Sequence, residues 1–151
     1  MTRRQTVPQQ WLILAQPLGD EMSRAVRRLP HGSGVLLLQR PSPREERRLR
    51  HLARLRGLTV VIEGPLTAAR VHNVRELRAA MSRRTPLILL SPLYRTQSHP
   101  DWQPLPRMRA AALARLAERQ AIALGGMNAR RYAKVAPLGF IAWAGISAFR
   151  T

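Results

Sequence analysis

Short apolar runs alternate with amphipathic or charged segments along almost the whole chain. Each run consists almost entirely of leucine, isoleucine, valine, alanine and tryptophan, so neither of its two faces is polar. Strands that are apolar on both faces occur in parallel sheets that are covered by helices. The alternation therefore predicts an α/β protein with a parallel sheet. The expected strands are Trp11–Ala15, Val35–Gln39, Leu58–Ile62, Leu87–Ser91, Ala121–Leu124 and Phe140–Ala144.

The segments between these runs carry the start and stop signals of helices. Pro41, Ser42 and Pro43 precede a strongly basic stretch, Arg44–Arg56, which has leucines three residues apart on one face. Gly57 then ends this expected helix. Other helices are expected at Asp20–Leu29, near Val74–Arg83, at Arg107–Arg119 and at Asn128–Val135.

The length of the chain limits the architectures that it can form. Its 151 residues and 17.1 kDa indicate a single domain over residues 1–151. A complete (β/α)₈ barrel usually needs roughly 200 residues or more. The absence of cysteine excludes disulfides and thiolate metal sites. The apolar run Trp11–Ala15 is too short for a signal-peptide core or a membrane span, so we expect a cytoplasmic protein with no membrane partner.

The net charge of +18 favours partners that carry phosphate. Only one of the 26 basic residues, Lys134, is a lysine, and so one-sided a use of arginine is typical of a genome-wide codon bias. The basic stretch Arg44–Arg56 also lacks interleaved aromatic side chains on which bases could stack. We therefore expect a small phosphorylated substrate as the partner, rather than a nucleic acid.

A glycine-rich turn, Ala121–Met127, joins an apolar run to a short polar helix. Without a Cβ the backbone of Gly125 and Gly126 can approach a ligand closely, and the N–H groups of the following helix favour an anion. The next strand also ends in small residues, Gly145-Ile146-Ser147. Two such neighbouring strand ends look like the phosphate site after the last two strands of a (β/α)₈ barrel.

Three segments carry a resemblance to a known family. "LLSPLYRTQSHP", "IALGGMNARR" and "GFIAWAGISAF" follow one another as in the second half of the thiamine phosphate synthase and thiazole tautomerase family. "RVHNVREL" resembles the family's strand-to-helix segment, in which a histidine precedes the helix. The resemblance covers roughly Val35 to Ala148 and is good from His72 onward. It implies a shortened TIM-like (β/α) barrel with parallel strands, in which about one strand and its flanking helices are missing around residues 63–73.

The resemblance also implies a set of site residues. His72 matches the histidine that acts as acid or base in the tautomerase branch, and His99 lies where many synthases have a lysine that contacts pyrophosphate. Gln39 matches the first residue of the Gln-x-Arg-x-Lys motif that binds the pyrimidine pyrophosphate. Thiazole phosphate would be bound by Thr96, Gln97, Ser98, Gly125 or Gly126, Ile146 and Ser147.

The departures from the family all concern the other substrate. The arginine and lysine of the pyrophosphate motif are replaced by Pro41 and Pro43. Glu63 is near the position of the first magnesium-binding aspartate, the second has no replacement, and the expected serine before the histidine segment is Arg70. We therefore expect no metal-binding residues and a degenerate pyrimidine-pyrophosphate half, with Mg²⁺ required only if the synthase reaction is retained.

Several functions remain open at this point. The chain could bind thiazole phosphate in thiamine biosynthesis without turnover, act as a synthase-type transferase, or transfer a proton through His72 as a thiazole tautomerase. A basic nucleic-acid-binding module and a structural relic are alternatives from other classes. His72 and His99 could equally be structural residues. A barrel that lacks a strand has two exposed edges, which a second copy in a homo-oligomer could cover.

Overall fold

In the computed structural model, which describes residues 7–15, 19–146 and 149, seven strands form one sheet. Their order is β3-β2-β1-β7-β6-β5-β4, and all neighbouring strands are parallel. The strands are β1 (Gln10–Leu14), β2 (Gly34–Leu37), β3 (Thr59–Ile62), β4 (Ala68–Val71), β5 (Leu87–Leu90), β6 (Ala121–Leu124) and β7 (Ala142–Gly145). The helices are α1 (Asp20–Arg28), α2 (Pro43–Arg56), α3 (Val74–Ser82), α4 (Arg107–Leu116), α5 (Ala129–Val135) and the 3₁₀ helix η1 (Ala136–Leu138).

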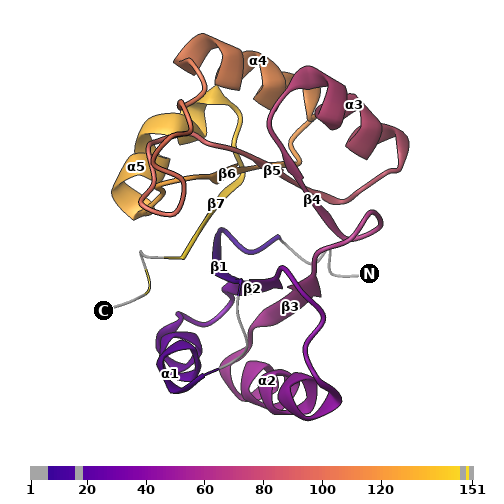
Figure 1. Cartoon of the computed structure of the whole chain (residues 1–151), viewed down its shortest axis with the longest axis vertical. Helices are drawn as coiled ribbons and strands as arrows, with labels where there is room; N and C mark the ends of the chain where they lie inside the picture. The colour runs from indigo at the N-terminus through magenta and orange to yellow at the C-terminus, as the bar shows by residue number, and fades with distance from the viewer. Residues whose placement is uncertain (1–6, 16–18, 147–148, 150–151) are drawn as a thin grey trace, which may run out of the picture.

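The sheet curls, and the helices lie on its outer side (Figure 1). Helices α1 and α2 cover β1 to β3, whereas α3, α4 and α5 cover β4 to β7. β3 and β4 are the two edges of the sheet, although they follow one another in the sequence. One strand and its helices are thus missing between them relative to an eight-stranded barrel, so the expectation of a shortened TIM-like barrel is confirmed.

The six apolar runs are strands, and their bounds differ from the predicted ones by at most two residues. The strand β4 was not predicted from apolar periodicity, because its four residues are two alanines, Arg70 and Val71. No helix separates β4 from β3, and a turn at residues 64–67 joins them. That a second copy covers these two edges stays a prediction.

Polar capping residues begin α2, α3 and α5, whereas α1 and α4 begin without a side-chain cap. Ser42 and Glu45 form a capping box at the start of α2, and Gly57 ends it in the left-handed conformation with φ 63°. Asn73 and Asn128 accept hydrogen bonds at the starts of α3 and α5. Among the described residues, no helix combines the length and the apolar character that crossing a membrane requires.

The interior of the curled sheet is filled by large apolar side chains. Trp11 is one of them and is only 2% exposed, and its indole N–H donates to the Pro8 carbonyl at 2.8 Å. The indole lies directly on Gly34 of the neighbouring strand, where an added Cβ would be 2.2 Å from a ring carbon. The interior is therefore a packed core rather than a channel. The buried residues that form this core are Trp11, Ile13, Leu36, Ala68, Leu87, Leu89, Ile122, Ala142 and Ala144.

Candidate functional site

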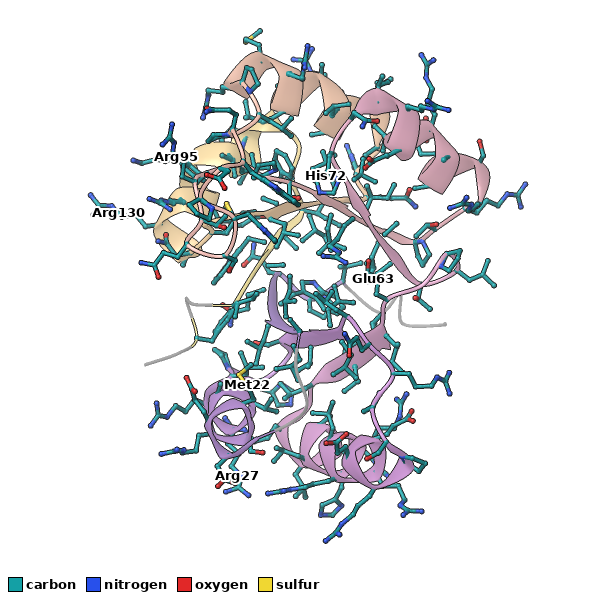
Figure 2. All side chains as sticks on the ribbon, in the orientation of Figure 1. Met22, Arg27, Glu63, His72, Arg95 and Arg130 are labelled. Atoms are coloured by element: carbon teal, nitrogen blue, oxygen red, sulfur yellow. The ribbon has the colours of Figure 1, made fainter. Side chains whose placement is uncertain are left out.

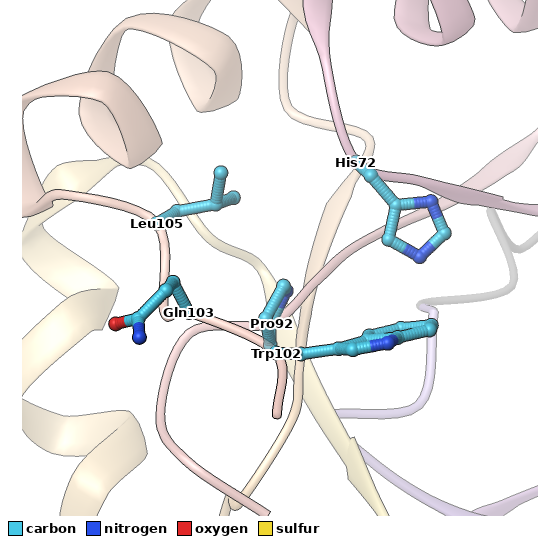
Figure 3. Close-up of a pocket in the computed structure, with 5 residues that line it drawn as sticks. All are labelled: His72, Pro92, Trp102, Gln103 and Leu105. Atoms are coloured by element: carbon cyan, nitrogen blue, oxygen red, sulfur yellow. The ribbon is translucent and has the colours of Figure 1, made fainter. Parts of the chain in front are cut away.

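An open groove of about 490 Å³ lies at the carboxyl ends of β4 and β5. His72 follows β4 directly, and the other lining residues belong to the loop between β5 and α4. In open parallel sheets and in barrels, ligands bind at this end of the strands. The lining residues are His72, Pro92, Trp102, Gln103 and Leu105 (Figure 3).

His72 is held by the first turn of α3. Its Nδ1 is 2.9 Å from Oε2 of Glu76, and its backbone N–H donates to the same oxygen at 2.8 Å. The side-chain amide of Asn73 donates to the other carboxylate oxygen at 3.2 Å. An ionised carboxylate can only accept, so Nδ1 carries the proton and Nε2 is left with a lone pair in the neutral ring. Among the described residues Nε2 has no hydrogen-bond partner, so it is available to a ligand.

The pKa of Glu76 supports this assignment. Burial acts to raise the pKa of this carboxyl, but the hydrogen bonds from the side chain and the backbone of His72 outweigh it, so the pKa is lowered from 4.5. Glu76 is therefore a carboxylate at neutral pH. A carboxylate on Nδ1 fixes the ring orientation and stabilises an imidazolium that forms when Nε2 takes up a proton.

Replacing Glu76 with glutamine should remove a stabilising interaction that depends on the ionised carboxylate. Because the folded-state pKa lies below 4.5, the contribution is present above about pH 4.5 and is lost as the pH falls through the lowered pKa. The side chain is 43% exposed, so we expect at most about 0.5 kcal/mol. Urea unfolding of both proteins at pH 7 and pH 3 measures it. A stability difference that grows on acidification would disprove the assignment.

Trp102 lies between the two candidate histidines. The ring of His99 stacks on its indole with centroids 4.1 Å apart and 10° between the planes. The ring of His72 meets it at 88° with centroids 5.4 Å apart, and Figure 3 shows the imidazole above the indole. His99 does not line the groove, so the structure brings only His72 of the two to the groove wall.

The loop after β5 carries three further predicted site residues. Thr96 is half-buried, and its Oγ1 accepts a hydrogen bond from the backbone N–H of His99 at 3.0 Å. Gln97 and Ser98 are exposed. The hydroxyl of Thr96 therefore shapes the loop and still has a proton to donate.

Gly125 and Gly126 have positive φ angles of 101° and 60°. A Cβ on Gly125 would lie 2.8 Å from Cα of Pro92, and one on Gly126 would lie 2.6 Å from the carbonyl oxygen of Arg95. The close approach that the glycines allow is therefore to the protein's own loop. The N–H of Gly126 has no hydrogen-bond partner among the described residues. Since Pro92 also lines the groove, this turn and the groove are neighbours.

Replacing Gly125 with alanine should destabilise the protein more than the same change at Gly139. Both glycines have positive φ angles, 101° and 114°, so the backbone penalty is similar. At Gly139 the nearest atom to an added Cβ is 3.6 Å away, whereas at Gly125 it meets the backbone of Pro92. Overpacking of this kind costs about 1–3 kcal/mol. Equal midpoints of urea unfolding for the two variants would contradict this packing.

Arg131 joins the glycine turn to the loop. Its Nη1 donates to the carbonyl of Gly126 at 2.5 Å, and its Cζ lies 4.6 Å from the ring centroid of Tyr94. Arg95 and Arg130 lie on the same side of the molecule (Figure 2). Arg130 and Arg131 thus come from α5 and Arg95 from the loop after β5, and these guanidinium groups favour an anion at this end of the site.

Glu63 and Arg70 bridge the two edges of the sheet. Arg70 Nε donates to Glu63 Oε1 at 3.0 Å, and in Figure 2 Glu63 lies where the two halves of the curled sheet meet. The other oxygen, Oε2, is buried without a hydrogen-bond partner in the described part of the chain. No group of three His, Asp or Glu residues that could hold a metal exists among the described residues. These donors do not fit Mg²⁺, which prefers several oxygen ligands.

Gln39 and Ile146 are not among the residues that line the groove. Gln39 follows β2 and is exposed, and Ile146 follows β7 and is half-buried. Ser147 lies outside the described residues.

Sequence reasoning missed Glu76, Trp102 and Arg131. The spacing of four residues between His72 and Glu76 was a usable signal, because such residues are neighbours on a helix face.

No family model and no curated protein matches this chain. Among solved structures, it is similar to thiamine phosphate pyrophosphorylase from Pyrococcus furiosus. The two have a TM-score of 0.73 and 13% sequence identity, over 95% of this chain and 88% of the other. This likeness establishes a common fold, that of a curled parallel α/β sheet related to TIM-like barrels.

Proposed function

We propose that this chain binds thiazole phosphate at the carboxyl ends of β4 to β7 and that His72 moves a proton on the bound ring. The observation that carries this proposal is the hydrogen bond between His72 Nδ1 and Glu76, which leaves Nε2 beside a groove without a partner in the described part of the chain. The fold shared with a thiamine phosphate pyrophosphorylase supports the substrate class. The chain would then act in thiamine biosynthesis as a thiazole tautomerase.

The proposed step needs only one acid–base group. Nε2 of the neutral His72 takes a proton from one ring position of a non-aromatic tautomer, and the imidazolium returns it at another position. The ligand keeps its composition and gains an aromatic ring. The carboxylate of Glu76 stabilises the imidazolium through the proton on Nδ1. An acid–base side chain placed in this way typically contributes about 10²–10⁴-fold to a rate.

The phosphate is proposed to lie beside the glycine turn. The N–H of Gly126, which has no partner in the residues that the structure describes, and the nearby Arg131 supply donors and positive charge. A Cβ on Gly125 would meet Pro92, which lines the groove, so the proposed phosphate position is next to the groove. The other proposed phosphate contacts are Thr96, Gln97, Ser98, Gly125, Ile146 and Ser147.

The synthase reaction is less well supported. Its leaving group is a metal–pyrophosphate, and the one carboxylate near the expected metal position, Glu63, is paired with Arg70. Gln39 is the one retained residue of the pyrophosphate motif, and it is exposed. A degenerate pyrimidine-pyrophosphate half therefore remains part of the proposal.

The test supplies the pure protein with a non-aromatic tautomer of thiazole phosphate and follows the ultraviolet absorbance of the aromatic product. We expect catalysed conversion without added metal. A parallel reaction with thiazole phosphate, the pyrimidine pyrophosphate and Mg²⁺ should yield no thiamine phosphate. Robust formation of thiamine phosphate would replace this proposal with the synthase. Binding to RNA that persists at physiological salt, with no conversion, would favour the nucleic-acid module.

A further inference from the structure

Trp102 is the exposed tryptophan of the described chain. It is 43% exposed, whereas Trp11 is 2% and Trp143 is 5% exposed. The exposed ring lies in a loop otherwise rich in proline and polar residues, and it lines the groove. A large aromatic ring kept at the wall of a groove offers a planar apolar surface to a ligand.

The orientation of the Trp102 indole is fixed by the ring of His99. His99 stacks on Trp102 with centroids 4.1 Å apart and is not among the residues that line the groove, so it restrains the indole from outside the groove. The loop turn that carries His99 is in turn held by Thr96, which accepts from the His99 N–H. On the groove side, the edge of His72 comes within a centroid distance of 5.4 Å of the same indole. His72 and Trp102 both line the groove, so the exposed part of the indole and the proton-carrying ring border one space.

We propose that Trp102 is the platform on which the planar heteroaromatic ring of the ligand stacks, with His99 as the positioning residue that holds the indole. This inference rests on the proposed function for the identity of the ring, and it extends that function to the residue that selects an aromatic ring. A ring stacked on the indole lies beside His72, whose Nε2 has no partner among the described residues. Stacking recognises any flat π-system, so the selected class is a planar five-membered heterocycle rather than an aliphatic phosphate ester.

The test compares matched variants in calorimetric titrations. Trp102→Phe keeps an aromatic platform, whereas Trp102→Leu keeps only apolar bulk. With thiazole phosphate, Trp102→Leu should raise Kd about tenfold and Trp102→Phe about threefold or less, as expected for the loss of one stacked ring. The Kd of ethyl phosphate, which has no ring, should be the same in all three proteins. A Trp102→Leu variant that binds thiazole phosphate as tightly as the wild type would overturn the proposal.

The positioning role of His99 has its own readout. His99→Ala should raise the Kd of thiazole phosphate about threefold, and His99→Phe should restore it, because a second aromatic ring can stack on the indole. A general acid or base at this position would not be rescued by phenylalanine. Loss of binding in both variants would therefore overturn the positioning role.

A ring without phosphate separates this inference from the proposed function. In a two-dimensional NMR spectrum of the ¹⁵N-labelled wild type, the indole N–H signal of Trp102 is assigned by its absence in Trp102→Leu. Titration with 4,5-dimethylthiazole should shift this signal to saturation, and ethyl phosphate should not shift it. If thiazole phosphate fails to bind but dimethylthiazole shifts the signal, the proposed function fails and the platform remains. If neither ring-containing ligand shifts the signal, the platform is wrong.

Discussion

Replacing His72 with glutamine should lower kcat for tautomer conversion by about 10²–10⁴-fold, the usual contribution of a positioned acid–base group. Glutamine can still hydrogen-bond with Glu76, but it cannot take up and return a proton near neutral pH. The binding of thiazole phosphate should change little, because the proposed phosphate contacts come from the turn and the loop rather than from β4. Initial rates and calorimetric Kd values for the two proteins measure these two effects separately.

The matched control for this variant is Glu76→Gln, which keeps the imidazole but removes the carboxylate on Nδ1. Its kcat should fall about 10- to 100-fold, the usual loss when a carboxylate that orients a metal-bound histidine is removed. A His72→Gln variant that retains wild-type kcat would exclude His72 as the proton carrier.

Replacing Trp11 with alanine should lower the free energy of unfolding by about 3–5 kcal/mol, the usual cost of removing a buried tryptophan. The indole fills the interior of the curled sheet, is 2% exposed and packs directly on Gly34. Because Gly34 has no side chain, the neighbouring strand cannot fill the space that the indole leaves. Domains of this size have about 5–15 kcal/mol of stability in total, so the variant should lose a large part of it.

Urea unfolding followed by circular dichroism measures this loss. Trp102→Ala is the control, because it makes the same substitution at a side chain that is 43% exposed. We expect the control to lose about 1 kcal/mol or less. Equal losses at the two positions would mean that Trp11 does not fill a packed interior.

Most strands could be predicted because they are apolar on both faces, and such runs occur in parallel sheets that are covered by helices. β4 could not be found from its apolar pattern, because it contains two alanines and Arg70. Arg70 is tolerated in a strand because it lies at the edge of the sheet, where it pairs with Glu63 at 3.0 Å. That partner lies across the gap left by the missing strand, and the periodicity of a sequence does not reveal such a contact.

The candidate site was predictable in part. His72 follows a strand, as the resemblance implied, and its partner Glu76 lies four residues later on a helix. Trp102 reaches the groove only because the proline-rich loop folds back across the end of β4, and local sequence does not determine that path. The Gly125-Gly126 pair was expected to face a ligand, and the structure adds a packing reason for both glycines. Phosphate binding at this turn stays a prediction.

The most direct test of the central claim is the melting temperature of the wild type with each half-substrate. At about 100-fold excess over Kd, a ligand adds roughly 2.7 kcal/mol of stability, which corresponds to a rise of several degrees for a chain of this length. We expect thiazole phosphate to raise the melting temperature in this way without metal, and the pyrimidine pyrophosphate to raise it weakly or not at all, even with Mg²⁺. A shift with the pyrimidine pyrophosphate alone, or with neither compound, would contradict a retained thiazole phosphate site.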